Sequence, residues 1–300
     1  MKTSLSKILK FIKDSDSITA VIFLLPFTIV YGMFLIHPII RGFYMSLHEW
    51  TIIRQMDFIG LDNYRRLITD SSFWEAAGNT FFFVITSSPT IVIGGLILAL
   101  ICNSKLKGTI ILKTAFFMPY VLSVAIISLI MVYFFQPYAG FVNTFLVNIG
   151  LSRVQWLDTE SLAWFVLVFA TLWWTVGFNM ILFLSALQDI PKIYYEAAKV
   201  DGATRWQSFW NITLPLIEPT TWTVVLLQVI FSSQVFAQMY LITGGGPGTS
   251  TRPLIQYIYQ TGFRRNNFGY GVSMAFVLLV VLTIFSLVFQ YVKNRRLSDR

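Results

Sequence analysis

The chain has 300 residues, a formal net charge of +8 and a hydrophobic fraction of 56%, but only 12% of its residues are charged. Soluble globular proteins carry about twice that share of charge, roughly 25%, so the composition excludes a protein whose whole surface faces water. The one cysteine, Cys102, excludes an intrachain disulfide, and the two histidines, His37 and His48, have no spacing that fits a zinc or iron site. The composition therefore predicts a chain that is solvated mostly by lipid.

Six apolar runs are long enough to cross the hydrocarbon core of a bilayer, which takes about 20 helical residues. In chain order they are Ile18–Ile40, Thr80–Ile101, Ala115–Phe135, Ser161–Ala186, Trp222–Thr243 and Gly269–Tyr291, and none contains Asp, Glu, Lys or Arg. Backbone groups in lipid must be hydrogen-bonded within the protein, and the apolar residues are consecutive instead of alternating, so we expect helices and not barrel strands. The predicted fold class is an all-α, polytopic membrane protein with six transmembrane helices.

Four prolines lie within or near the ends of these runs. Pro26, Pro89 and Pro119 are expected to kink their helices, which helix bundles tolerate. Pro38 lies near the end of the first run and is expected to help stop that helix.

The basic residues are divided unequally between the two sides of the membrane. Fourteen of the 22 lie in the N-terminal segment, in the segments after the second and fourth spans, and in the C-terminal tail. Because cytoplasmic segments carry the excess of Lys and Arg, both termini are expected in the cytoplasm. The first run is too long for the apolar region of a cleaved signal peptide, the alternative that its preceding lysines raise. The predicted organisation is a cytoplasmic segment 1–17, a six-helix domain 18–293 and a cytoplasmic tail 294–300, and the basic excess needs no nucleic-acid partner.

Two segments on the opposite side have a distinctive composition. Ser46–Asn79 mixes aromatic and charged residues, which is typical of a segment at the membrane interface. Gly244–Gly248 lacks the Lys-Ser/Thr ending of a phosphate-binding loop, so we expect a turn, with contact to a substrate-binding protein as a further role.

The cytoplasmic segment between the fourth and fifth spans, Asp189–Leu216, contains local signals for two short helices separated by a glycine. In chain order the signals are an N-cap at Asp189 with Pro191 in the first turn, a left-handed C-terminus at Gly202, a capping box of Thr204 with Gln207, and a stop at Pro215. One interpretation is an amphipathic connector that lies against the bilayer. The small side chains of Ala197, Ala198 and Ala203 favour the other, in which a groove of another protein closes over the backbone.

This segment also resembles the EAA loop of membrane subunits of binding-protein-dependent ABC importers. The match comprises Glu196-Ala197-Ala198, Gly202 four residues later and Ile212-Thr213-Leu214-Pro215. In that family the loop is a coupling helix that docks into a cleft of the ATPase subunit. The resemblance therefore implies a coupling loop at residues 189–216, and these ATPase-coupling residues: Glu196, Ala197, Ala198, Asp201, Gly202 and Ala203.

Three further stretches, Phe58–Trp74, Phe117–Tyr120 and Leu241–Thr251, resemble the carbohydrate importers, of the type of the larger maltose permease subunit and the glycerol-phosphate permeases. The resemblance extends from about Ile18 to Arg296, without the extra N-terminal spans and large periplasmic insertion of the maltose subunit. It implies import of a sugar, an oligosaccharide or a glycerol-phosphate-like solute across a bacterial or archaeal cell membrane. The implied partners are a second permease of the complementary type, two copies of an ABC ATPase that bind ATP and Mg, and an extracytoplasmic solute-binding protein. The chain itself is expected to hold no cofactor and to catalyse no reaction.

Polar residues inside uncharged spans are costly, so they tend to face a partner helix or a water-filled path. The candidates for a substrate path are Tyr120, Ser123, Thr171, Trp174, Thr175, Asn179, Gln228, Ser232, Gln234 and Gln238. On a continuous helix the three glutamines fall within an arc of about 120°. Two plainer roles stay open, namely hydrogen bonds from Ser or Thr to their own helix and a polar face packed against a neighbouring helix. Amides, hydroxyls and aromatic faces suit an uncharged sugar better than an ion.

Two other functional classes fit the spans less well. A secondary transporter coupled to protons or sodium usually places Asp, Glu or His within the membrane, and the six runs contain no carboxylate. An intramembrane enzyme needs a nucleophile and a base, and the only candidate base is His37 at the end of a span.

Overall fold

The structure is a computed structural model that describes residues 15–104 and 108–298. Most of the predicted segment 1–17, several of the basic residues that set the predicted orientation and the end of the tail 294–300 lie outside the described residues. The chain divides into two compact units, one of residues 1–68 and 261–276 and the other of residues 69–260 and 277–300. Most described residues are helical, which confirms the helical class of the fold.

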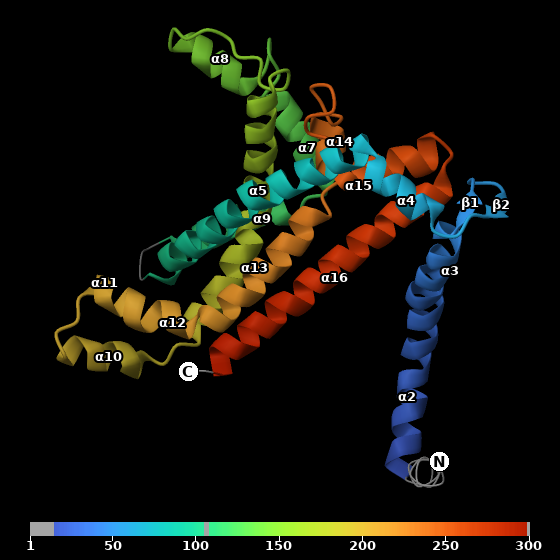
Figure 1. Ribbon diagram of the computed structural model, residues 1–300. Helices are drawn as coiled ribbons and strands as arrows, with labels where there is room; N and C mark the ends of the chain where they lie inside the picture. The colour runs from blue at the N-terminus through green and yellow to red at the C-terminus, as the bar shows by residue number, and fades with distance from the viewer. Residues whose placement is uncertain (1–14, 105–107, 299–300) are drawn as a thin grey trace. The chain divides into compact units, whose positions relative to one another are not determined.

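The first unit contains a helical run, a β-hairpin, a short helix and the start of the last helix (Figure 1). These elements are α2 (Ser15–Tyr31), the π-helical turn η1 (Gly32–Ile36), α3 (His37–Ser46), β1 (His48–Trp50), β2 (Gln55–Phe58), α4 (Asp62–Thr69) and the beginning of α16 (Phe268–Ser298). The antiparallel hairpin is the departure, among described residues, from a purely helical fold. The side-chain amide of Asn63 stabilises the base of the hairpin, because it donates to the carbonyl of Ser46 at 2.8 Å and to that of His48 at 3.2 Å.

The expectation that Pro38 stops the first helix is wrong, because α3 continues through this proline to Ser46. In the preceding turn η1 the amide of His37 bonds to the carbonyl of Gly32, one residue farther back than in an α-helix. A proline ring clashes with the carbonyl four residues earlier, and here that residue, Phe34, lies in the widened turn. The wider turn therefore lets the helix pass the proline.

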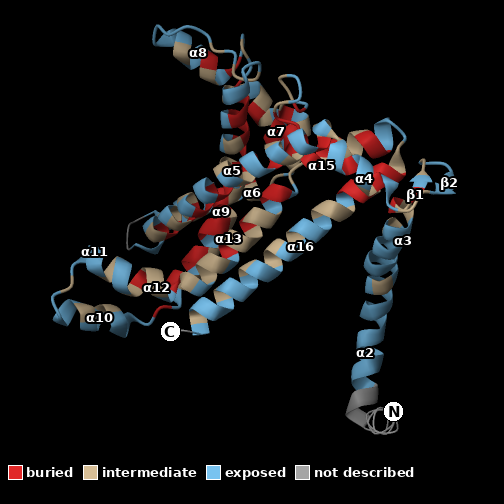
Figure 2. Cartoon of the chain, in the orientation of Figure 1, coloured by how far each residue is buried: buried red, intermediate tan, exposed pale blue. Residues whose placement is uncertain are grey.

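Helices α5 (Ser71–Asn103) and α9 (Glu160–Gln188) form the centre of the second unit, with α6 (Thr109–Val121) and α13 (Glu218–Ser233) packed against them. Figure 2 shows buried residues along α9 and α13. Glycines permit the close approach of these helices. A Cβ at Gly177 of α9 would lie 2.1 Å from the carbonyl oxygen of Phe116 in α6, and a Cβ at Gly95 of α5 would lie 2.7 Å from the Cβ of Asn179.

Two of the predicted spans are broken and not continuous. In the third, α7 (Val124–Phe134) leaves α6 at an angle of 103°. In the fifth, α13 ends at Ser233 and the short α14 (Ala237–Ile242) begins only after residues 234–236. Four described helices are long and apolar enough to cross a membrane, and up to six spans result if each bent helix pair counts as one. Hydropathy is continuous through both breaks, so it carries no information about the change of direction.

The loops between the long helices hold shorter helices, among them α8 (Phe141–Asn148), α15 (Leu254–Tyr259) and the π-helical turn η3 (Gln260–Arg264). The predicted turn at Gly244–Gly248 is confirmed, with φ of +66°, +95° and +62° at Gly244, Gly245 and Gly248. The amide of Asn79 in α5 fixes this turn, since it donates to the carbonyl of Thr249 at 3.0 Å.

Candidate functional site

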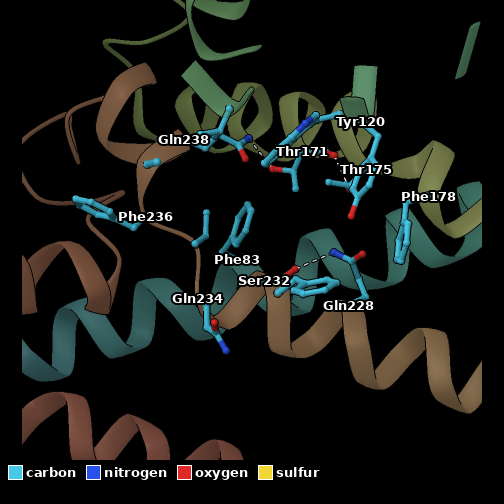
Figure 3. A pocket seen from close by; sticks show the side chains of 15 residues that line it. Phe83, Tyr120, Thr171, Thr175, Phe178, Gln228, Ser232, Gln234, Phe236 and Gln238 are labelled. Atoms are coloured by element: carbon cyan, nitrogen blue, oxygen red, sulfur yellow. Dashed lines mark hydrogen bonds between the residues drawn. The ribbon is translucent and has the colours of Figure 1, made fainter. Parts of the chain in front are cut away.

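A cavity of about 510 Å³ lies in the second unit, next to the break between α13 and α14 (Figure 3). Six helices line it, namely α5, α6, α7, α9, α13 and α14. None of the fifteen described residues that line it has a charged side chain. The lining instead combines neutral hydrogen-bonding groups with the aromatic rings of Phe83, Tyr120, Trp174, Phe178, Phe231 and Phe236.

The cavity brings together eight of the ten residues that the sequence proposed for the substrate path. These eight are Tyr120, Thr171, Trp174, Thr175, Gln228, Ser232, Gln234 and Gln238. The other two, Ser123 and Asn179, do not line it. The hydroxyl of Ser123 caps the N-terminus of α7 by accepting from the amide of Ile126 at 3.4 Å, and Asn179 is buried behind the lining with 1% of its surface exposed.

On one wall of the cavity the side chain of Gln238 joins α14 to α9 (Figure 3). Its Nε2 donates to Oγ1 of Thr171 at 2.7 Å and to the carbonyl of Leu167 at 3.3 Å. Thr171 also donates to the carbonyl of Leu167, and Thr175 donates to that of Thr171, both at 2.7 Å. These threonines therefore bond to their own helix, which is one of the plainer roles left open by the sequence. The Thr171 oxygen is still available as an acceptor for Gln238.

On the opposite wall Gln228 and Ser232 are one helical turn apart on α13 (Figure 3). Gln228 Nε2 donates to Ser232 Oγ at 3.1 Å, and Gln228 Oε1 accepts from Asn179 Nδ2 at 2.9 Å. Both ends of the Gln228 amide are thus held by neighbouring helical residues. This wall combines a packed polar face with a surface that reaches the cavity.

Gln234 differs from the other two glutamines because it lies in the break itself. It is the C-cap of α13, its side chain is exposed, and in Figure 3 its amide extends away from the other labelled side chains. The expected single face of three glutamines on one continuous helix is therefore wrong. The break brings Gln238 to the cavity from a separate helix, α14.

Most of the aromatic residues that line the cavity were not predicted from the sequence. Tyr120 stacks on Phe178 with ring centroids 4.9 Å apart and an interplanar angle of 17°. Phe83, Phe231 and Phe236 also line the cavity. With 28 phenylalanines in the chain, no sequence signal separates these rings from those that face lipid or the core. The indole of Trp174 donates to the carbonyl of Leu122 at 3.3 Å and so satisfies a backbone group that the break between α6 and α7 frees.

The second set of candidates lies in the segment 189–216, where the structure forms α10 (Lys192–Val200), α11 (Arg205–Ser208), the π-helical turn η2 (Phe209–Thr213) and α12 (Leu214–Leu216). The left-handed end of α10 is confirmed, with φ of +76° at Gly202. The amide of Gly202 bonds to the carbonyl of Lys199 and that of Ala203 to the carbonyl of Ala198, which together form a Schellman motif. The predicted capping box of Thr204 and Gln207 is confirmed as well.

One expectation for this segment is wrong. Asp189 is the C-cap of α9 and not an N-cap, and the extended residue Pro191 precedes α10 instead. The stop expected at Pro215 is confirmed to within one residue, because the helical run through η2 and α12 ends at Leu216. The chain bends by 65° one residue after α12, at the junction with α13, where Pro219 occupies the first turn.

The two faces of α10 differ in their contacts. Tyr195 is packed against the core of the second unit and forms a hydrogen bond of 2.9 Å with Thr213. Large apolar side chains elsewhere on the segment are exposed, with exposed fractions of 68% for Ile193, 88% for Val200 and 68% for Trp206. The candidate coupling residues lie on this partly uncovered segment, where Glu196, Ala197, Asp201 and Gly202 are exposed and Ala198 and Ala203 are half-buried.

Residues 69–298 match the family described as "Binding-protein-dependent transport system inner membrane component". The trehalose/maltose transport system permease protein MalF of Thermococcus litoralis is 36% identical over 277 residues, which cover 91% of this chain and 92% of that protein. The arabinooligosaccharides transport system permease protein AraP of Bacillus subtilis is 33% identical over 270 residues, covering 89% and 86%. A solved structure of a bacterial ABC transporter involved in the import of the acidic polysaccharide alginate matches with a TM-score of 0.86 at 28% identity, covering 96% of this chain and 99% of that chain.

Proposed function

This chain belongs to the family of binding-protein-dependent transport system inner membrane components, and we propose that its cavity passes an uncharged sugar or oligosaccharide. The chain is a permease subunit of an ABC importer, and ATP hydrolysis belongs to a separate subunit. The observation that carries the proposal is a lining of amides, hydroxyls and aromatic rings in which none of the fifteen described residues is charged.

This lining suits the chemistry of a neutral saccharide. Hydroxyl groups of a sugar exchange hydrogen bonds with water for bonds to amides and hydroxyls such as those of Gln228, Ser232 and Tyr120. The apolar C–H face of the sugar ring packs on aromatic rings such as Trp174 and Phe178. Tyr120 directs its hydroxyl into the cavity (Figure 3). This hydroxyl forms no hydrogen bond with a described residue, so it is available to a substrate.

An anionic substrate fits the same lining poorly. A carboxylate or phosphate taken out of water requires a cation or several donors to offset a desolvation cost of several kcal/mol. The solved neighbour is involved in the import of the acidic polysaccharide alginate, whose carboxylates the uncharged lining of this cavity does not match. The names of the trehalose/maltose and arabinooligosaccharide permeases support the neutral class. A glycerol-phosphate-like solute is disfavoured by the same absence of cationic lining residues.

The segment 189–216 is the proposed site of coupling to the ATPase. Its exposed apolar side chains and small residues supply a surface that a cleft of another protein can cover. We place Glu196, Ala197, Ala198, Asp201, Gly202 and Ala203 in that contact. The proposed assembly is a heterodimer with a complementary permease, two ATPase copies that bind ATP and Mg, and an extracytoplasmic binding protein. In this assembly six spans place both termini and the coupling segment in the cytoplasm.

The substrate class is tested by uptake in cells that produce the complete importer. Labelled maltose, trehalose and arabinotriose are the probes, and unlabelled glycerol 3-phosphate and galacturonate are the competitors. We expect uptake of at least one neutral sugar, lost in a strain without this chain, and no inhibition by a hundredfold excess of either anion. Inhibition by either anion comparable to that by the unlabelled sugar would contradict the uncharged class.

A further inference from the structure

A buried polar cluster behind the cavity lining joins three helices of the second unit. It consists of Asn179 on α9, Gln228 and Ser232 on α13, and Ser87 and Ser88 on α5. Asn179 donates to Gln228 at 2.9 Å and Gln228 donates to Ser232 at 3.1 Å. Ser232 Oγ also forms hydrogen bonds with Ser87 Oγ at 3.2 Å and with Ser88 Oγ at 3.3 Å. Of these five residues only Gln228 and Ser232 line the cavity.

The cluster holds the side chain of Gln228, which together with Ser232 connects it to the cavity. A glutamine amide has two N–H donors and two acceptor lone pairs. Asn179 occupies one lone pair of Gln228 and Ser232 occupies one N–H, so one donor and one acceptor site are left for the cavity. Rotation of this amide by 180° would bring its NH₂ group against the donating NH₂ group of Asn179. With Asn179 donating as it does in the structure, the contact favours the orientation in which Gln228 Oε1 faces Asn179 and Nε2 faces Ser232.

Asn179 is itself held tightly and does not reach the substrate. Only 1% of its surface is exposed. Its Cβ lies against Gly95 of α5, where even an added methyl group would come within 2.7 Å. Any effect of Asn179 on a bound sugar must consequently pass through Gln228.

Gln234 provides an internal comparison. It also lines the cavity, but its side chain is exposed and, among the described residues, has no hydrogen-bond partner. A free glutamine loses roughly 1 kcal/mol or more of side-chain entropy when it binds a ligand, whereas a glutamine that is already held does not. Of the two amides Gln228 is therefore the one prepared for binding.

We propose that Asn179 is a positioning residue, which orients the Gln228 amide for hydrogen bonding to the sugar in the cavity, with Ser232 and its two serine partners holding the other end. This inference rests on the proposed function, because it names how one side of that same cavity is prepared for its substrate. It assigns to Asn179 a role through Gln228 and not a contact with the sugar.

The test compares Asn179→Leu, Gln228→Leu and the double variant in the complete importer. Leucine has the same number of side-chain heavy atoms as asparagine, branched at the same carbon, and it removes the donor without adding a charge. Uptake is measured with whichever of labelled maltose, trehalose or arabinotriose the wild-type importer transports best. We expect Asn179→Leu to raise KM about tenfold, the factor that corresponds to the loss of one hydrogen bond, with maximal rate and membrane abundance within twofold of wild type. In the Gln228→Leu background the same change should leave KM unaltered.

Each other outcome overturns the proposal. Direct contact between Asn179 and the sugar would raise KM by the same factor in both backgrounds. A purely structural role would lower abundance and maximal rate with KM unchanged. The matched control is Ser233→Ala, which removes a buried hydroxyl next to Ser232 that, among described residues, bonds to its own helix at Val229 alone; its KM should equal that of wild type.

A readout without sugar separates this proposal from the proposed function. The melting temperature of the detergent-purified complex is measured for the same three variants. If Asn179 and Gln228 are coupled, the double variant changes the melting temperature by less than the sum of the single variants, and additive changes would overturn the inference. A wild-type importer that takes up none of the three sugars contradicts the substrate class, while the coupling is still read from the melting temperatures.

Discussion

At the scale of single residues, Gly202 combines a structural requirement with an exposed position. Its φ of +76° belongs to the left-handed region, and it closes α10 through the Schellman hydrogen bonds of its own amide and that of Ala203. No atom lies within 4 Å of a Cβ added there. Within this chain a side chain at Gly202 therefore meets only backbone strain, on the order of 1 kcal/mol, and no steric clash.

Because a side chain at Gly202 strains the backbone without clashing with this chain, substitutions at this position test the docking of the coupling segment. Gly202→Asp should reach the membrane at wild-type abundance, because insertion depends on the spans, but it should fail to bind the ATPase and lose sugar uptake. Gly202→Ala should retain most of both, since it adds one methyl group and no charge. The measurements are uptake of labelled sugar and recovery of the ATPase with the tagged permease.

Gly202→Asn is the control for backbone strain, because asparagine tolerates the left-handed region and has the same shape as aspartate. If the added charge and not the strain weakens docking, the asparagine variant should retain more ATPase than the aspartate variant. Normal uptake by Gly202→Asp at normal abundance would contradict a docking role and favour the interpretation of the segment as a connector that lies on the bilayer.

At the scale of helices, the sequence predicts what depends on neighbouring residues and misses what depends on packing. The glycine end of α10 and the capping box of Thr204 with Gln207 follow from a few adjacent residues, and both are confirmed. The stop expected at Pro38 is wrong because a π-helical turn precedes this proline and relieves its clash. A π-helical turn has no distinctive composition, so it could not be anticipated.

The same division holds for the cavity. Polar residues in uncharged spans are visible in the sequence, and eight of the ten candidates line one cavity. The sequence could not indicate that the break after Ser233 places Gln238 on a separate helix, nor that Asn179 lies behind the lining. Those placements depend on which helices approach one another. Gly177 and Gly95 permit that approach, and each contacts residues that are far from it in the sequence.

One ion pair connects the helix that follows the coupling segment to the last helix. Glu218, at the start of α13, bonds to Arg296 of α16 at 2.9 Å and accepts from the indole of Trp222 at 3.2 Å. The carboxylate is largely buried, with 13% of its side chain exposed, whereas the arginine is 59% exposed. The pair thus lies directly after the 65° bend between α12 and α13, where it can hold the angle of the coupling segment.

Reversing these charges tests the pair. Arg296→Glu should lower the melting temperature of the purified complex, by an amount that corresponds to about 1 kcal/mol, because it places two carboxylates together. The double variant Glu218→Arg with Arg296→Glu should recover part of this loss, since opposite charges meet again. A loss in the double variant equal to the sum of the losses in the two single variants, Glu218→Arg and Arg296→Glu, would show that the pair contributes nothing. Arg295→Glu, an exposed neighbour on the same helix, is the control for a change of net charge.

At the scale of the whole chain, the number of membrane crossings depends on the two bent helix pairs. Four helices suffice by length alone, and the α6–α7 and α11–α13 pairs bring the number to as many as six. If a bent pair returns to the side from which it came, every later segment is on the opposite side from the one we propose. The proposed cytoplasmic position of the coupling segment therefore requires that the α6–α7 pair crosses.

Cysteine labelling in sealed cells distinguishes these arrangements. Single cysteines replace Ala197 in the coupling segment, Thr249 in the glycine turn and Arg295 near the end of α16, in a background in which the native Cys102 is replaced by serine. All three positions are exposed in this chain, and the cells produce it without the ATPase subunit that is proposed to cover Ala197, so a failure to react with an impermeant maleimide reports the side of the membrane and not burial. With six crossings we expect labelling at Thr249→Cys alone, and labelling at all three after the cells are permeabilised.

If both bent pairs return, Ala197→Cys and Thr249→Cys lie on the same side and react together, while Arg295→Cys lies across the last span. Joint labelling of the first two positions would thus contradict six spans, and it would also remove the coupling role of the segment, because an ATPase acts only from the cytoplasm.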